Sequence, residues 1–96
     1  MKDLSTIKKI LQKLKPELEK KFHVSSIGIF GSLVRNDFSE SSDIDIIVDF
    51  SQPIGISFLD LADLLEENFH EHVDLVSKKG IKPQYFSSIE KEIVYV

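Results

Sequence analysis

The chain has 96 residues, of which 42% are hydrophobic, and it carries a net charge of −4 and no cysteine. This length and apolar content predict a single globular domain spanning residues 1–96. The acidic balance and the single arginine exclude the continuous basic surface that long DNA or RNA requires. The absence of cysteine excludes disulfides and thiol catalysis. Because neither a secretion signal nor an apolar run of ~18 residues is present, we expect a cytoplasmic protein that does not enter the membrane.

The first segment predicts an amphipathic helix, with Asp3 and Ser5 as candidate caps before it. Pro16 lacks the N–H that a helix interior needs, but it suits the first position of a renewed helix. We therefore expect a break near Lys15. The apolar residues that recur at helical spacing are Leu4, Ile7, Leu11, Leu14 and Leu18.

The first strand is predicted over residues 24–30, which are rich in β-prone side chains. Alternation places Ile27 and Ile29 on one face of this strand, and Gly28 and Phe30 on the other. A short turn of helix should follow from Ser32, at the point where the strand ends.

Two further strands are predicted over residues 43–50 and 72–77, because both segments have a β-branched apolar centre. Between them, Ser57 and Asp60 form a candidate capping box at the start of a helix. That helix carries an apolar stripe made of Phe58, Leu61, Leu65 and Phe69.

A short closing helix should begin around Pro83 or Gln84. The predicted order is therefore helix, strand, short helix, strand, helix, strand, helix. This order is typical of an α/β (α+β) domain with a small mixed sheet flanked by helices. The second and third strands are linked by a helical crossover that can join parallel neighbours, whereas the shorter link between the first two strands allows either direction.

Asp43 and Asp45 are two residues apart at the start of a predicted strand, so the pleat should direct both carboxylates to the same face. Asp74 is the one acid within the central part of the third strand and is a candidate for completing the same site. A divalent cation would relieve the repulsion among these acids, since Mg²⁺ prefers carboxylate and phosphate oxygens. Three carboxylates around two ions, ~3.5–4 Å apart, would suit in-line attack on a phosphorus atom. We therefore predict that Asp43, Asp45 and Asp74 are catalytic and bind metal.

Gly31 and Ser32 are expected where the first strand ends and a helix begins. Glycine lets a phosphate approach the backbone, and Ser32 offers a hydroxyl and N–H groups at a positive helix terminus. Arg35 follows one turn later and can reach a phosphate or brace a carboxylate with its planar guanidinium group. We therefore predict that Gly31, Ser32 and Arg35 bind nucleotide.

Other polar residues have a weaker claim to the site. Asp49 has the strand parity of Asp43 and Asp45, but we interpret it as an acid at a strand end. His70 and His72 lack ligand spacing with the acids, although His72 shares the parity of Asp74 and is a candidate for the rim of the site.

The run from Gly31 to Asp45 resembles the signature of the DNA polymerase β-like nucleotidyltransferase superfamily, in which Gly-Ser is followed by ten residues and then Asp-x-Asp. The closest resemblance is to the minimal nucleotidyltransferases, antitoxin-like proteins of roughly a hundred residues, and it covers nearly the whole chain. The resemblance implies that Asp43, Asp45 and Asp74 hold Mg²⁺ and that the Gly-Ser turn binds nucleotide phosphate. Asn36 departs from the pattern, since relatives commonly have glycine there, but asparagine tolerates a left-handed backbone.

The resemblance further implies that AMP is transferred from ATP to a tyrosine of a HEPN-domain toxin, which silences the toxin. Because the chain offers no residues for a separate acceptor-binding domain, we expect acceptor recognition to come from the partner or from the rim of the site. A hetero-complex, or an oligomer, is compatible with this expectation.

Two other functions are compatible with the sequence. The protein can act as a binding module that neutralises its partner by contact alone, or it can modify a small molecule such as an aminoglycoside. The short chain disfavours the small-molecule activity.

Overall fold

The computed structural model describes residues 3–96 and confirms the predicted mixture of helices and strands. The elements follow in the order α1 (Leu4–Phe22), β1 (Val24–Phe30), α2 (Ser32–Arg35), β2 (Ile44–Phe50), α3 (Ser57–Phe69), β3 (Val73–Ser77), α4 (Pro83–Ile89), the 3₁₀ helix η1 (Glu90–Glu92) and β4 (Val94–Tyr95).

The four strands form one mixed sheet in the order β3-β2-β1-β4. Strands β2 and β3 are parallel neighbours, which the helical crossover between them allows. The link between β1 and β2, whose direction the sequence left open, joins antiparallel strands, and β1 is also antiparallel to β4. The central strands β1 and β2 therefore have neighbours on both edges.

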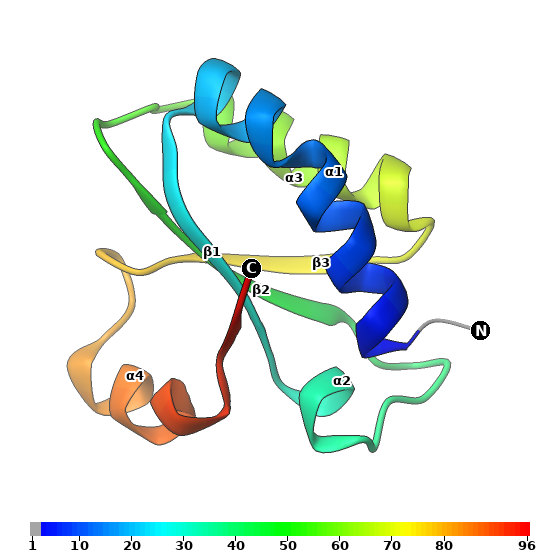
Figure 1. Cartoon of the computed structure of the whole chain (residues 1–96). Helices are drawn as coiled ribbons and strands as arrows, with labels where there is room; N and C mark the ends of the chain where they lie inside the picture. Colours follow the sequence, from blue (N-terminus) through cyan, green and yellow to red (C-terminus); the bar gives the residue numbers. More distant parts are fainter. Residues whose placement is uncertain (1–2) are drawn as a thin grey trace.

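Helices cover both faces of this sheet (Figure 1). On one side, α1 and α3 pack together over the main core, which includes Ile27 and Ile29 of β1. On the opposite side, α4 covers a smaller cluster in which Ile89 packs against Phe30 and Ile47. The predicted division of β1 side chains between the two faces is therefore confirmed. Within residues 3–96, no helix is both long and apolar enough to cross a membrane.

Helix α1 is continuous, so the predicted break near Lys15 is wrong. Pro16 lies inside the helix and is exposed, and the carbonyl that loses its hydrogen-bond donor belongs to Gln12, which is also exposed. Interior proline costs about 3 kcal/mol relative to alanine. Burial of Leu18 and Phe22 beyond the proline outweighs this cost, since each fully buried side chain of this kind contributes ~1.5–3 kcal/mol. The predicted cap at the other end is confirmed, because the Asp3 carboxylate accepts a hydrogen bond from the Thr6 N–H at 2.8 Å.

The start of α3 differs from the prediction of a capping box. Ser57 is the first helical residue, and no side chain caps this terminus. A tight backbone turn precedes the helix, in which the N–H groups of Ser57, Phe58 and Leu59 donate to the carbonyls of Ile54, Gly55 and Ile56. The orphan donors of the helix terminus are thus satisfied by the backbone, which leaves the serine without this role.

The C-terminal segment contains two elements that the sequence did not predict, η1 and β4. Strand β4 pairs with β1 through Gly28↔Tyr95 and Ile29↔Val94. A side chain at position 28 would meet the Ile93 side chain at 2.6 Å, so glycine is required for this close approach. Strands β2 and β3 each begin one residue later than predicted, so Asp43 and His72 precede their strands.

The first prediction concerns the proline of α1. Pro16→Ala restores a backbone hydrogen bond to the Gln12 carbonyl and removes the steric conflict, so the free energy of unfolding should rise by about 2 kcal/mol. Denaturant unfolding of the variant and of Lys15→Ala, as a control in the same helix, measures this. An unchanged or lower stability of Pro16→Ala would contradict a continuous α1.

Candidate active site

Gly31 forms the sharp turn between β1 and α2. It is buried and adopts φ 80° and ψ −152°, a conformation that essentially only glycine tolerates. A side chain at this position would also collide with the Asp45 carboxylate. The Gly31 carbonyl accepts hydrogen bonds from the N–H groups of Val34 and Arg35, both at 3.0 Å. The absence of a side chain therefore allows the turn to lie directly against Asp45.

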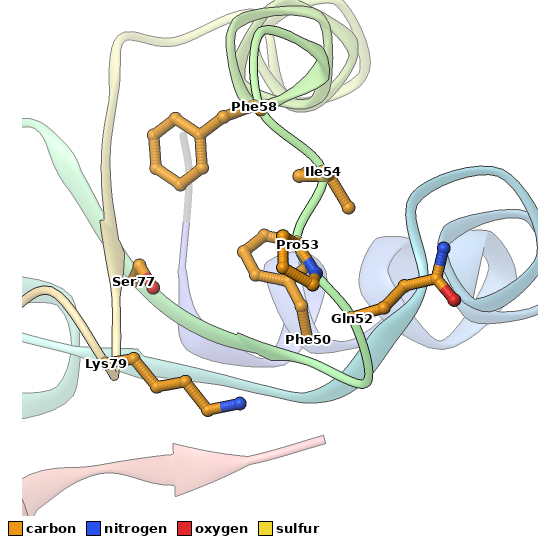
Figure 2. Close-up of a pocket in the computed structure, with 8 residues that line it drawn as sticks. Phe50, Gln52, Pro53, Ile54, Phe58, Ser77 and Lys79 are labelled. Carbon is orange, nitrogen blue, oxygen red and sulfur yellow. The ribbon is translucent and has the colours of Figure 1, made fainter.

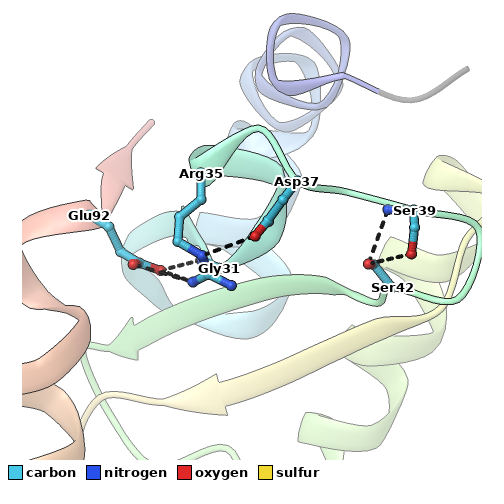
Figure 3. A network of polar contacts seen from close by, with 6 residues as sticks. All are labelled: Gly31, Arg35, Asp37, Ser39, Ser42 and Glu92. Atoms are coloured by element: carbon cyan, nitrogen blue, oxygen red, sulfur yellow. Dashed lines mark hydrogen bonds and ion pairs between the residues drawn. The ribbon is translucent and has the colours of Figure 1, made fainter.

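The loop between α2 and β2 is held by short-range polar contacts. Asn36 ends α2 in the left-handed conformation, at φ 66° and ψ 31°, which confirms that asparagine preserves this turn. Further along, the Ser39 N–H donates to the Ser42 hydroxyl at 3.1 Å, while the Ser42 N–H donates to the Ser39 carbonyl (Figure 3). These contacts form a tight turn directly before Asp43, after which β2 begins.

The sheet register brings Asp45 and Asp74 together. Asp45 lies opposite Phe30 of β1 on one side and opposite Asp74 of β3 on the other. Just before this pair, the Ile44 N–H donates to the His72 carbonyl at 2.9 Å and so aligns the starts of the two strands. Asp43 and Asp74 are exposed, whereas Asp45 is half-buried. Two of the three predicted acids are therefore neighbours, and the third lies at the entrance to β2.

The electrostatic environment of Asp45 raises its pKa to about 6. Burial of the carboxyl group is the largest cause, followed by the negative charges of Asp74 and Asp43, and the nearby Arg35 partly opposes them. Carboxylates with pKa values raised by like charges are typical of sites that bind cations or transfer protons. The charges of Asp74 and Asp43 therefore disfavour ionisation of Asp45.

A network that the sequence did not predict joins the Gly31 turn to the C-terminal segment (Figure 3). The Gly31 N–H donates to Glu92 Oε2 at 2.6 Å, and Arg35 Nη1 lies 3.1 Å from the same oxygen. Arg35 Nε also lies 3.7 Å from Asp37 Oδ2. No local pattern marks Glu92, which is one of two acids in η1 and lies 61 residues from Gly31 in the sequence.

The residues with a weaker claim lie apart from these contacts. The Asp49 carboxylate accepts a hydrogen bond from the N–H of Phe50 and lies opposite Ser26 in the sheet. The exposed His72 side chain lies 3.9 Å from Glu66 of α3. Neither contact involves the acids at the start of β2 and β3.

The exposed side chains of Asp43 and Asp74 leave this part of the site open to solvent, whereas Asp45 is half-buried and Gly31 is buried. A cavity of about 370 Å³ lies near the far end of β2, and its lining includes the apolar side chains of Phe50, Pro53 and Phe58 (Figure 2). Because Phe50 ends β2 and Asp45 lies near its start, this cavity is separate from the acids.

The carboxylates have the chemistry that magnesium requires. No three Asp, Glu or His side chains within residues 3–96 already form a group that would hold an ion alone. Mg²⁺, however, commonly binds through one or two carboxylates together with substrate phosphates. The adjacent Asp45 and Asp74, whose charges repel each other, fit this mode of binding, and Asp43 lies close enough to affect the pKa of Asp45.

Comparison with known proteins defines the class of this fold and site. Residues 12–95 match the family described as polymerase beta, nucleotidyltransferase. The chain therefore belongs to the polymerase beta nucleotidyltransferase family. It is 44% identical to a protein of Methanocaldococcus jannaschii that bears the provisional name protein adenylyltransferase, with full coverage of both chains. It is 41% identical to the protein adenylyltransferase MntA of Thermococcus cleftensis, over 100% of this chain and 98% of that one.

Solved structures confirm the predicted fold. A structure described as a minimal nucleotidyltransferase superposes with a TM-score of 0.80 at 26% identity, covering 97% of this chain and 95% of the other. An MNT antitoxin in complex with a tri-AMPylated HEPN toxin of Shewanella oneidensis gives a TM-score of 0.68 at 21% identity, covering 93% of this chain and 70% of the other. The resemblance of the sequence to minimal nucleotidyltransferases is thereby confirmed.

The second prediction follows from the pKa of Asp45. This pKa is about 6 in the folded protein and 3.8 for an isolated aspartate side chain in water, so the folded state binds more protons between these pH values and loses stability as the pH rises through 6. Asp45→Asn removes this loss. After allowance for solvent screening, the variant should be about 1 kcal/mol more stable than the wild type at pH 8 and equally stable below pH 4.

Unfolding measured across this pH range tests the prediction. Asp63→Asn makes the same charge change on an exposed part of α3 and should keep the wild-type profile. A stability difference between Asp45→Asn and the wild type that does not vary with pH would contradict the electrostatic origin of the effect.

Proposed function

We propose that this protein is a magnesium-dependent protein adenylyltransferase that transfers AMP from ATP to a tyrosine of a HEPN-domain toxin and thereby acts as its antitoxin. One observation carries the proposal. The Gly31 turn lies directly against Asp45, and Asp45 is paired with Asp74 in the sheet. A phosphate-binding turn and paired carboxylates at one place are what the transfer of a nucleotidyl group requires.

The relatives support the choice of reaction and acceptor. Both full-length relatives bear the name protein adenylyltransferase. The HEPN toxin in the structurally similar complex carries AMP groups, and another toxin–antitoxin structure with a TM-score of 0.70 contains the ATP analogue AMP-PNP. The exposure of Asp43 and Asp74 agrees with a protein acceptor.

In the proposed reaction, the tyrosine hydroxyl oxygen forms a bond to the α-phosphorus of ATP, and the bond from that phosphorus to the bridging oxygen breaks to release diphosphate. Gly31, Ser32 and Arg35 bind the phosphates of the nucleotide. Asp43, Asp45 and Asp74 would hold Mg²⁺, which would supply positive charge to balance the phosphates. The exposed Asp74 is positioned at the sheet edge to accept the proton of the incoming hydroxyl. Catalysis then rests on alignment and charge stabilisation.

The third prediction tests the acids in this reaction. With labelled ATP, Mg²⁺ and the proposed HEPN-domain partner, the wild type should label that partner. Asp43→Asn combined with Asp45→Asn should lower the rate at least ~100-fold, because the metal-binding charge is lost. Asp74→Asn should act similarly. Asp49→Asn is a matched control on the same strand and should retain transfer, since asparagine can still accept the hydrogen bond from Phe50.

The same variants separate the proposal from its competitors. If the wild type does not label the partner and the acid-substituted proteins still protect cells from it, the protein neutralises its partner by contact alone. If labelling occurs on an aminoglycoside and not on the partner, the acceptor in the proposal is wrong.

A further inference from the structure

The Glu92 side chain lies at the junction between the C-terminal segment and the Gly31 turn. It comes from η1, between α4 and β4, and it is mostly buried, with 22% of the side chain exposed. Its carboxylate receives a hydrogen bond from the Gly31 N–H at 2.6 Å and lies 3.1 Å from Arg35 Nη1. Hydrogen bonds to ionised groups of this kind are about twice as strong as neutral ones. The Glu92 carboxylate therefore contacts two residues, Gly31 and Arg35, that bind the nucleotide phosphates in the proposed function.

The Gly31 turn is held from three directions. The Gly31 carbonyl is fixed by the first residues of α2, its N–H is fixed by Glu92, and its Cα faces the Asp45 carboxylate without room for a side chain. Gly31 has a φ of 80°, which most residues do not favour. The surrounding contacts must therefore maintain this backbone conformation. Of these three contacts, the hydrogen bond to Glu92 is the one made by a residue that lies outside β1, α2, β2 and β3.

Glu92 leaves donors available for a phosphate. Arginine has five N–H donors, and the hydrogen bonds to Glu92 use Nη1. The carboxylate thus orients the guanidinium group and the turn, while Nη2 of Arg35 takes no part in the hydrogen bonds to Glu92.

From these contacts we propose that Glu92 is a positioning residue, which fixes the Gly31 turn and Arg35 in the geometry that binds the nucleotide triphosphate next to Asp45. This proposal rests on the proposed function. The C-terminal segment, anchored to β1 by the two pairs of β4, carries the carboxylate to the turn. The C-terminal segment therefore takes part in shaping the nucleotide site, although none of its residues needs to touch the nucleotide.

The fourth prediction concerns two substitutions at this position. Glu92→Ala removes both contacts, and misplacement of the turn should raise the Kd for a non-hydrolysable ATP analogue with Mg²⁺, and the KM for ATP, about tenfold. Glu92→Gln keeps an oxygen that can accept the Gly31 N–H, so it should recover part of the affinity. The KM for the partner protein should not change. Glu90→Ala removes the same charge from an exposed position in the same 3₁₀ helix and should behave as wild type.

A double-mutant cycle with Arg35→Ala tests whether Glu92 acts through the arginine. If it does, the double variant should bind the analogue more tightly than the sum of the two single losses predicts. A purely structural loss would instead lower the folded fraction and with it the apparent kcat, while both KM values stay unchanged, and thermal unfolding of each variant detects it.

Three outcomes decide between the proposals. If the wild type binds the analogue and Glu92→Ala binds it with the same affinity, the positioning role is overturned and the proposed function stands. Tighter binding in Glu92→Ala also overturns it, because the carboxylate would then compete with the phosphates. Failure of the wild type both to bind the analogue and to label its partner overturns the proposed function, and with it this role.

Discussion

The repulsion among carboxylates at the start of β2 and β3 is the interaction on which the rest of the site depends. The parallel register places Asp45 opposite Asp74, and Asp43 precedes the same strand, so burial and like charge together raise the pKa of Asp45 to about 6. A fold gains no stability from such an arrangement. In the proposed function, a cation with nucleotide phosphates would balance these charges, and the same proximity would place the metal next to the Gly31 turn.

The Gly31 turn converts this charge cluster into a candidate nucleotide site. It lies against Asp45 because glycine has no side chain there, and Glu92 holds it from the opposite end of the chain. Three parts of the chain therefore meet at this site: the turn between β1 and α2, the starts of β2 and β3, and η1. The main core packs the sheet against α1 and α3. This packing keeps the sheet rigid and so maintains the spacing of the segments at the site.

The sequence predicted features that depend on local patterns. The bounds of β1 and the Gly-Ser turn at its end follow from alternation and glycine position, and the length of the linker allowed β2 and β3 to be parallel. The pairing of Asp45 with Asp74 depends on the register of the sheet, which no local pattern predicted. Features that depend on distant contacts were missed. Strand β4 has two residues and forms only because β1 offers an edge, and Glu92 acquires its contacts only when η1 folds back. Pro16 misled the prediction because burial of Leu18 and Phe22 outweighs the local penalty.

The most direct test of this account is the titration of the Asp45 carboxyl group, followed by NMR of its side-chain carbon with and without Mg²⁺ and a non-hydrolysable ATP analogue. The account predicts a pKa near 6 without metal, because burial and the charges of Asp74 and Asp43 disfavour ionisation. It also predicts that the pKa falls well below this value when Mg²⁺ and the analogue bind, since a cation favours the ionised form. An ordinary pKa without metal, or a raised pKa that Mg²⁺ and the analogue leave unchanged, would contradict it.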